Sequence, residues 1–170
     1  MPNARYFVRP LLLCCVALAG LVLGTGAGEK RGPLVAVRFH GETTEYEGSF
    51  AQAVKLPDGR QVFVERLPLI SEANMIAFHP FAAANGTQGA AFQLDRHGTL
   101  ALLNVSTAKR GSFLVAMVNG RVITPIQVDR QIEDGIVVLP FGLTPTEVAL
   151  LDKSMPRIGQ PPKKKSHDFD

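Results

Sequence analysis

The histidines are the side chains best suited to acid–base or metal chemistry, but their spacing supports neither. The chain contains four of them: His40, His79, His97 and His167. No two form the HxH, HxxH or HExxH spacing in which two imidazoles reach one metal ion. We interpret His79, in Phe78-His-Pro-Phe81, as a loop residue between packed aromatic rings, and His97 as part of a strand-to-helix turn. The histidines therefore predict no metal site.

Other chemistry-bearing residues have structural interpretations. The sequence contains no GxSxG, P-loop or GxGxxG motif. Four serines suit turns or helix caps: Ser49, Ser71, Ser106 and Ser112. The acidic segment with Asp129, Glu133 and Asp134 could bind a cation weakly, although a solvated loop is the favoured interpretation. We therefore predict a protein that is not an enzyme, with no catalytic residues, no metal and no cofactor.

The first 28 residues predict an export signal. Arg5 and Arg9 precede an uncharged, apolar run that ends in small residues near Ala27, where a signal peptidase could cleave before Gly28 or Glu29. An uncleaved membrane anchor is the alternative, because the run approaches the ~20 residues that span a bilayer. Either reading predicts a periplasmic or otherwise extracytoplasmic protein. Both cysteines, Cys14 and Cys15, lie in this segment, which excludes disulfides and thiolate sites from the remaining chain.

The charge balance does not indicate a nucleic-acid partner. Lys and Arg number 18 against 15 Asp and Glu, and omitting Arg5 and Arg9 lowers the net charge from +3 to +1. Three of the remaining lysines, residues 163–165, lie in a polar, proline-containing segment at 159–170. That segment predicts a disordered basic tail, which could touch anionic lipid but is better interpreted as solvated. Residues 29–158 are long enough for one domain.

Two hairpins are the clearest predicted elements. Residues 113–126 form two β-rich runs joined by Asn119-Gly120, which tolerates the positive φ angles of a type I′ turn. Residues 50–56 and 61–67 are joined by Pro57-Asp58-Gly59, another turn signal. Further strands are predicted at 34–39, 90–94 and 136–139.

Helices are predicted at three places. Ser71 could cap a short helix through about Ala77, and residues 99–110 have helical spacing followed by Gly111. Thr144-Pro-Thr-Glu147 is a capping box with proline at its first position, so it predicts the start of a final helix. Together these elements predict an α+β fold, with helices on one face of a mostly antiparallel sheet.

From about Arg60 to Lys153 the chain resembles the head subdomain of the large periplasmic loop of SecD, a membrane component of the bacterial Sec export machinery. The resemblance lies in Leu114–Ile123 with Pro125, and in Ile132-Glu-Asp-Gly135 followed by Leu143–Ala149. Two shorter segments, Val64–Ser71 and Ala91–Asp95, resemble that family's entry to its first helix and a following strand. The sequence departs from the family by one missing residue before Pro125 and by Phe141 in place of a glycine.

The resemblance implies a ferredoxin-like two-layer sandwich and an extracytoplasmic location. In that family the head is thought to engage emerging polypeptide, so the resemblance implies a polypeptide or an envelope protein as partner. A structural or assembly subunit of an envelope complex is the alternative function, and an unrecognised hydrolase is a third. Contact with the membrane would come through the N-terminal segment. The apolar runs at 113–126 and 136–141 are longer than one buried face needs, which predicts exposed apolar side chains on these strands.

Overall fold

The computed structural model describes residues 35–44 and 49–161. Contacts within the chain separate Met1–Gly32 from Pro33–Asp170, and every described element belongs to the second unit. The leader predicted at 1–28 and residues 162–170 of the predicted tail lie outside the described residues. None of the described helices is both long and apolar enough to cross a membrane.

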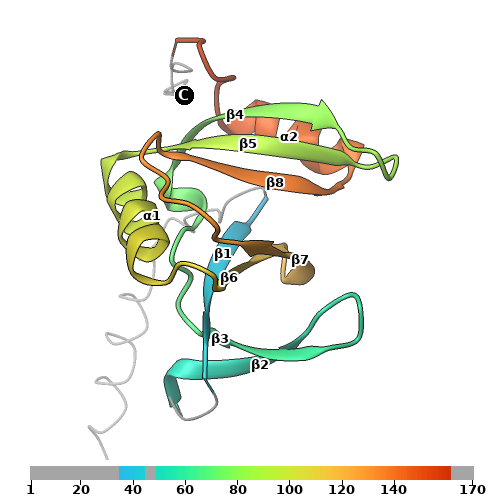
Figure 1. The fold of residues 1–170 in the computed structure, drawn as a ribbon. Helices are drawn as coiled ribbons and strands as arrows, with labels where there is room; N and C mark the ends of the chain where they lie inside the picture. Colours follow the sequence, from blue (N-terminus) through green and yellow to red (C-terminus); the bar gives the residue numbers. More distant parts are fainter. Residues whose placement is uncertain (1–34, 45–48, 162–170) are drawn as a thin grey trace, which may run out of the picture. The chain divides into compact units, whose positions relative to one another are not determined.

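A five-stranded antiparallel sheet contains both predicted hairpins (Figure 1). Its strands are β1 (Val37–Thr43), β2 (Ala51–Lys55), β3 (Gln61–Glu65), β6 (Phe113–Val118) and β7 (Arg121–Gln127), in the order β2-β3-β1-β6-β7. The first five residues of β1 pair with β6 and its last two pair with β3. β1 therefore joins the β2–β3 hairpin to the β6–β7 hairpin.

A second, three-stranded antiparallel sheet has the order β4-β5-β8. Its strands are β4 (Met75–Ala82), β5 (Gln88–Leu94) and β8 (Ile136–Leu143), and the helices are α1 (Arg96–Ala108) and α2 (Pro145–Ser154). The α+β class and the mostly antiparallel pairing predicted from the sequence are confirmed. The strands divide between two sheets, however, whereas the sequence predicted one sheet covered by helices.

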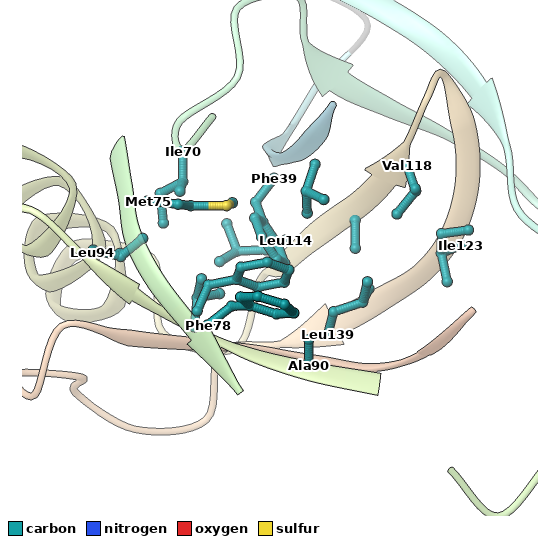
Figure 2. Packing of buried hydrophobic residues seen from close by; sticks show 14 of the residues in the cluster. Phe39, Ile70, Met75, Phe78, Ala90, Leu94, Leu114, Val118, Ile123 and Leu139 are labelled. Carbon is teal, nitrogen blue, oxygen red and sulfur yellow. The ribbon is translucent and has the colours of Figure 1, made fainter. Parts of the chain in front are cut away.

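The main core contains side chains from both sheets and both helices. Phe39 and Leu114 come from the five-stranded sheet, while Phe78 and Leu139 come from the three-stranded sheet (Figure 2). Phe92 of the three-stranded sheet belongs to the same cluster. The rings of Phe78 and Phe92 stack with centroids 6.3 Å apart. The helices complete this cluster with Leu102, Val105, Val148 and Leu151. Packing between two sheets is possible because each presents one apolar face to the other.

A second core covers the opposite face of β6. Every residue from Leu114 to Val118 is buried, although alternate side chains of a strand point to opposite faces. Leu114, Ala116 and Val118 join the main core, whereas Val115 and Met117 pack with Leu56 and Val64 of the β2–β3 hairpin. The sequence predicted that apolar side chains on the second face of β6 would be exposed, but they are buried in this second core.

The segment after Pro68 differs from its prediction. A single 3-10 turn, Glu72–Asn74, replaces the short helix predicted to run through Ala77, and β4 begins at Met75. β4 also includes the residues around Pro80 that were expected to interrupt regular structure. Proline disfavours helical backbone in the preceding residue, and pairing with β5 stabilises the extended conformation instead. Helical propensity at 71–77 is outweighed by this pairing.

Several boundaries also shift. β5 begins at Gln88 and β8 continues to Leu143, so both strands are longer than predicted. α1 begins at Arg96 rather than Thr99, because the Asp95 carboxylate accepts the Gly98 N–H at 2.7 Å and caps the helix earlier. The strand predicted at 34–39 is β1, which starts at Val37 and continues into the segment expected to be a loop.

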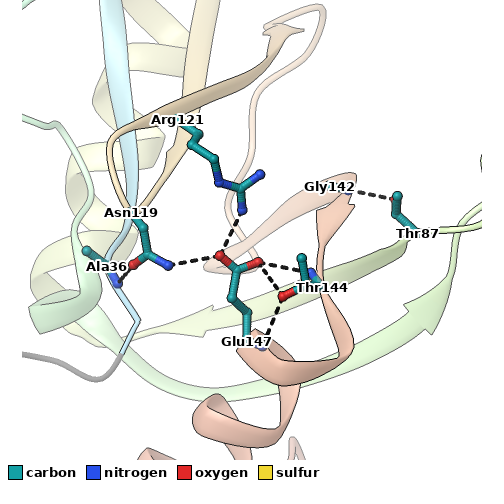
Figure 3. Close-up of polar contacts among 7 residues, drawn as sticks. All are labelled: Ala36, Thr87, Asn119, Arg121, Gly142, Thr144 and Glu147. Carbon is teal, nitrogen blue, oxygen red and sulfur yellow. Dashed lines mark hydrogen bonds and ion pairs between the residues drawn. The ribbon is translucent and has the colours of Figure 1, made fainter.

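The predicted turn and capping box are confirmed and meet in one polar network (Figure 3). Asn119 and Gly120 have φ angles of 50° and 79°, as a type I′ turn requires. The Asn119 side chain accepts the Ala36 N–H at 3.0 Å and donates to Glu147 Oε1 at 2.9 Å. Arg121 donates to the same oxygen at 2.8 Å, while Thr144 donates twice to Oε2. Glu147 therefore joins the start of α2 to the β6–β7 turn.

This network predicts a pH-dependent contribution to stability. Burial alone would raise the pKa of Glu147, but hydrogen bonds from the Thr144 backbone, the Arg121 guanidinium and the Thr144 hydroxyl outweigh it and lower the pKa below its ordinary value of 4.5. A lowered pKa stabilises the fold above the ordinary value, and the contribution disappears as pH falls through the folded-state pKa. We expect Glu147→Gln to cost about 1–2 kcal/mol at pH 7 and much less at pH 3.

Urea unfolding of both proteins at the two pH values measures this difference. Glu133→Gln is the matched control, because Glu133 is exposed and lies in the connector before β8. A cost for Glu147→Gln that is equal at pH 7 and pH 3 would contradict the role assigned to the carboxylate charge.

Candidate functional site

Four strands lie at the edges of the two sheets, and three of them contain proline. These are β7 with Pro125, β4 with Pro80 and β8 with Pro140. Proline has no N–H to donate to an added strand, so it protects a sheet edge from further pairing. The edge of β4 is also partly covered, since residues 156–158 make two backbone hydrogen bonds with Phe78. Among the described edge strands, β2 alone lacks proline.

Two backbone hydrogen bonds show which groups of β2 point outward. The Leu56 N–H bonds to the Arg60 carbonyl, and the Arg66 N–H bonds to the Phe50 carbonyl, each at 2.8 Å. Backbone groups alternate in direction along a strand, so even-numbered residues between these bonds face β3. The odd-numbered residues Ala51, Ala53 and Lys55 therefore point their N–H and C=O groups outward.

The open end of this hairpin exposes two large apolar side chains. Phe50 is 73% exposed and Leu67 is 79% exposed, the highest values among the exposed large hydrophobic residues described. They border the same shallow depression, with Ser49, Glu65 and Arg66. Isolated apolar side chains are common on surfaces, but a pair beside an unprotected strand edge is suited to binding an apolar segment.

A groove of about 360 Å³ lies over the face of the sheet that carries the second core. Its lining comes from β1, β2, β6 and β7 and from residues beside them: Ala36, Arg38, His40, Gln52, Val54, Arg66, Met117, Gly120 and Val122. Arg38 and Arg66 bring positive charge to the groove, and none of its lining residues in the described part of the chain is an aspartate or glutamate. The groove therefore combines an apolar base with a cationic wall.

The histidine in this groove has a fixed ring orientation. His40 is 4% exposed, and its Nδ1 lies 2.8 Å from the Glu65 carbonyl oxygen. A carbonyl oxygen only accepts, so Nδ1 must carry the proton and donate. Nε2 makes no hydrogen bond among the described residues, which leaves it available to a ligand as an acceptor, or as a donor when the ring is protonated.

The two arginines differ in their partners. Arg38 forms an ion pair with Glu72 through two hydrogen bonds, Nη2 to Oε1 at 3.1 Å and Nε to Oε2 at 3.3 Å. Arg66 donates from Nε to the Ala51 carbonyl at 3.1 Å, and its guanidinium has no carboxylate partner among the described residues. Arg66 is therefore the arginine of the groove that can pair with an incoming anion.

The remaining sequence candidates do not gather at this groove. His79 is exposed on β4 rather than in a loop, His97 is exposed in the first turn of α1, and His167 lies outside the described residues. Ser106 is buried, donates to the Leu103 carbonyl and accepts the Ile132 N–H. Within residues 35–44 and 49–161, no three His, Cys, Asp or Glu side chains could hold a metal ion together.

The groove and the β2 edge were not predicted from the sequence. The residues that form them come from β1 and from two hairpins that are distant in sequence, and no local motif connects Gln52 and Arg66 with Met117. One available signal was the distribution of proline, which is present in β4, β7 and β8 but absent from 51–55. Chemically, the arrangement can pair a strand through its backbone and bind an anion through Arg66 and His40.

No protein-family model and no curated protein matches this sequence. Three chains among solved structures match it. A structure of SecDF, described as a membrane component that enhances protein export, is 15% identical with a TM-score of 0.49, covering 79% of this chain and 69% of that one. A crystal structure of SecDF in a super-membrane-facing form is 18% identical with a TM-score of 0.48, covering 72% of this chain and 19% of that one.

Proposed function

We propose that this protein is a non-enzymatic, extracytoplasmic domain that binds an extended polypeptide as an added strand along β2. The observation that carries the proposal is the outward backbone of Ala53 and Lys55 on an edge strand without proline. Backbone hydrogen bonds of this kind give affinity without requiring one sequence, as in other cases of strand addition. The predicted export signal supports a location outside the cytoplasmic membrane.

The exposed pair Phe50 and Leu67 would supply the apolar part of the binding energy. Both side chains lie at the open end of the β2–β3 hairpin, so a strand along β2 could extend over them. Transferring apolar surface out of water contributes about 25 cal/mol per Å². After the entropic cost of ordering a flexible chain, we expect a dissociation constant in the micromolar range, about −8 kcal/mol.

A proline substitution in β2 tests the proposal. The probe is a fluorescent, strand-forming heptapeptide of alternating Val and Thr with a central Gln, blocked at both ends, and anisotropy with the full chain measures its affinity. We expect Ala53→Pro to weaken binding at least tenfold, because Ala53 does not donate to β3 and its outward N–H is lost. Ala53→Thr retains the N–H and is the matched control.

The apolar contribution is tested with Phe50→Ser and Leu67→Ser, which we expect to weaken binding several-fold while the melting temperature stays unchanged. The exposed Val138 of β8 provides a control, since Val138→Ser removes a similar apolar side chain far from β2 in sequence. Unchanged affinity in a folded Ala53→Pro protein would overturn strand addition. If no peptide binds while one envelope protein co-purifies in a fixed ratio, the assembly-subunit alternative replaces the proposal.

A further inference from the structure

We infer that the groove selects an acidic side chain of the bound polypeptide, with Arg66 and His40 contacting its carboxylate. This inference rests on the proposed function, because it names a preference of the same binding surface. Gln52 and Val54 of β2 point their side chains into the groove. A strand added beside β2 places alternate side chains on that same face of the sheet. One side chain of the polypeptide would therefore enter the groove.

Charge determines which side chain suits this position. Arg38, His40 and Arg66 line the groove, and within residues 35–44 and 49–161 no lining residue is acidic. Glu72 already pairs with Arg38 through both carboxylate oxygens, whereas Arg66 has no carboxylate partner among the described residues. An incoming carboxylate would complete the hydrogen bonding of Arg66, and charge-assisted hydrogen bonds are about twice as strong as neutral ones.

His40 provides a second contact in the groove. Its Nδ1 bond to the Glu65 carbonyl fixes the ring, and its Nε2 is unpaired among the described residues although the side chain is 4% exposed. A carboxylate only accepts, so its contact with Nε2 requires the ring to donate from both nitrogens. The apolar lining of Val54, Met117 and Val122 would contact the side chain's methylene groups and its apolar neighbours. The ligand class is thus an extended segment with one acidic residue among apolar ones.

The decisive comparison uses two peptides that differ in one atom group. One is the blocked heptapeptide with central Gln, and the other carries Glu at that position, so its side chain holds the sole carboxylate. We expect the Glu peptide to bind the full chain roughly tenfold more tightly at low salt, a difference of about 1.4 kcal/mol. The preference should shrink as ionic strength rises, because screening weakens partly exposed charge pairs.

Arg66→Gln should remove the preference for Glu, measured as the ratio of the two peptides' dissociation constants, because the variant has no guanidinium to pair with the carboxylate. Arg66→Lys retains the charge but loses the paired donors of the guanidinium, so we expect an intermediate preference. The control is Arg130→Gln, which removes the same charge from an exposed residue of the connector after β7 and should leave the preference intact. ¹⁵N NMR of the imidazole should show His40 Nε2 shifting with the Glu peptide and not with the Gln peptide.

The outcomes separate this inference from the proposed function. Equal affinity for the two peptides, or a preference that survives Arg66→Gln, overturns carboxylate selection and leaves strand binding intact. If the Glu peptide leaves the His40 spectrum unchanged, the contact between His40 and the peptide's carboxylate is overturned. Failure of both peptides to bind overturns the proposed function and the inference together.

Discussion

Replacing Val115 by Asp is expected to remove a large part of the free energy that stabilises the fold. Val115 is 1% exposed on β6 and packs in the second core with Leu56 and Val64. The substitution removes apolar contacts and places a carboxylate among the apolar side chains of that cluster. We expect a loss of about 4 kcal/mol or more, a large part of the ~5–15 kcal/mol that usually stabilises such a domain. Urea unfolding followed by circular dichroism measures the loss.

Val138→Asp is the matched control. Val138 is also in a β-strand but is 44% exposed, so its carboxylate stays hydrated and the expected cost is below about 1 kcal/mol. Equal costs at the two positions would contradict the second core. They would instead indicate that this face of β6 is open to solvent, as the sequence alone suggested.

Gly142→Ala is expected to lower the free energy of unfolding by roughly 2–5 kcal/mol. Gly142 has a φ of 97°, which side chains rarely adopt, and an added Cβ would collide with Ile123 Cγ2. The backbone strain contributes about 1–2 kcal/mol and the collision a further ~1–3 kcal/mol. Because Ile123 belongs to β7 and Gly142 to β8, the substitution disturbs a contact between the two sheets. Thermal unfolding measured by calorimetry tests this value.

The backbone strain can be measured separately with Gly86→Ala. Gly86 has a φ of 79° in the β4–β5 connection, and an added Cβ meets no atom within 4 Å. We expect Gly86→Ala to lower the free energy of unfolding by about 1 kcal/mol. The additional loss in Gly142→Ala then measures the collision with Ile123. If the two alanine variants melt at the same temperature, the assigned close contact between Gly142 of β8 and Ile123 of β7 is contradicted.

The sequence by itself determined the local elements that depend on a few neighbouring residues. Asn119-Gly120 adopts its turn because both residues tolerate positive φ. Thr144 and Glu147 start α2 because the side chain of each accepts a hydrogen bond from the backbone N–H of the other. The α+β class follows from the same signals. Where a short signal competed with long-range pairing, as at Ser71 to Ala77, local propensity predicted the wrong element.

The tertiary structure alone decided how these elements combine. A strand such as β6, apolar at every residue, is compatible with exposure of one face or with burial of both. Burial on both faces required β1 to join the two hairpins, which placed Val64 against Met117 and left β2 at a sheet edge. The groove arises from the same arrangement, since Arg66 and His40 approach only after β1 pairs with β3 and β6. Such contacts depend on the free energy of packing distant segments, which no short stretch of sequence specifies.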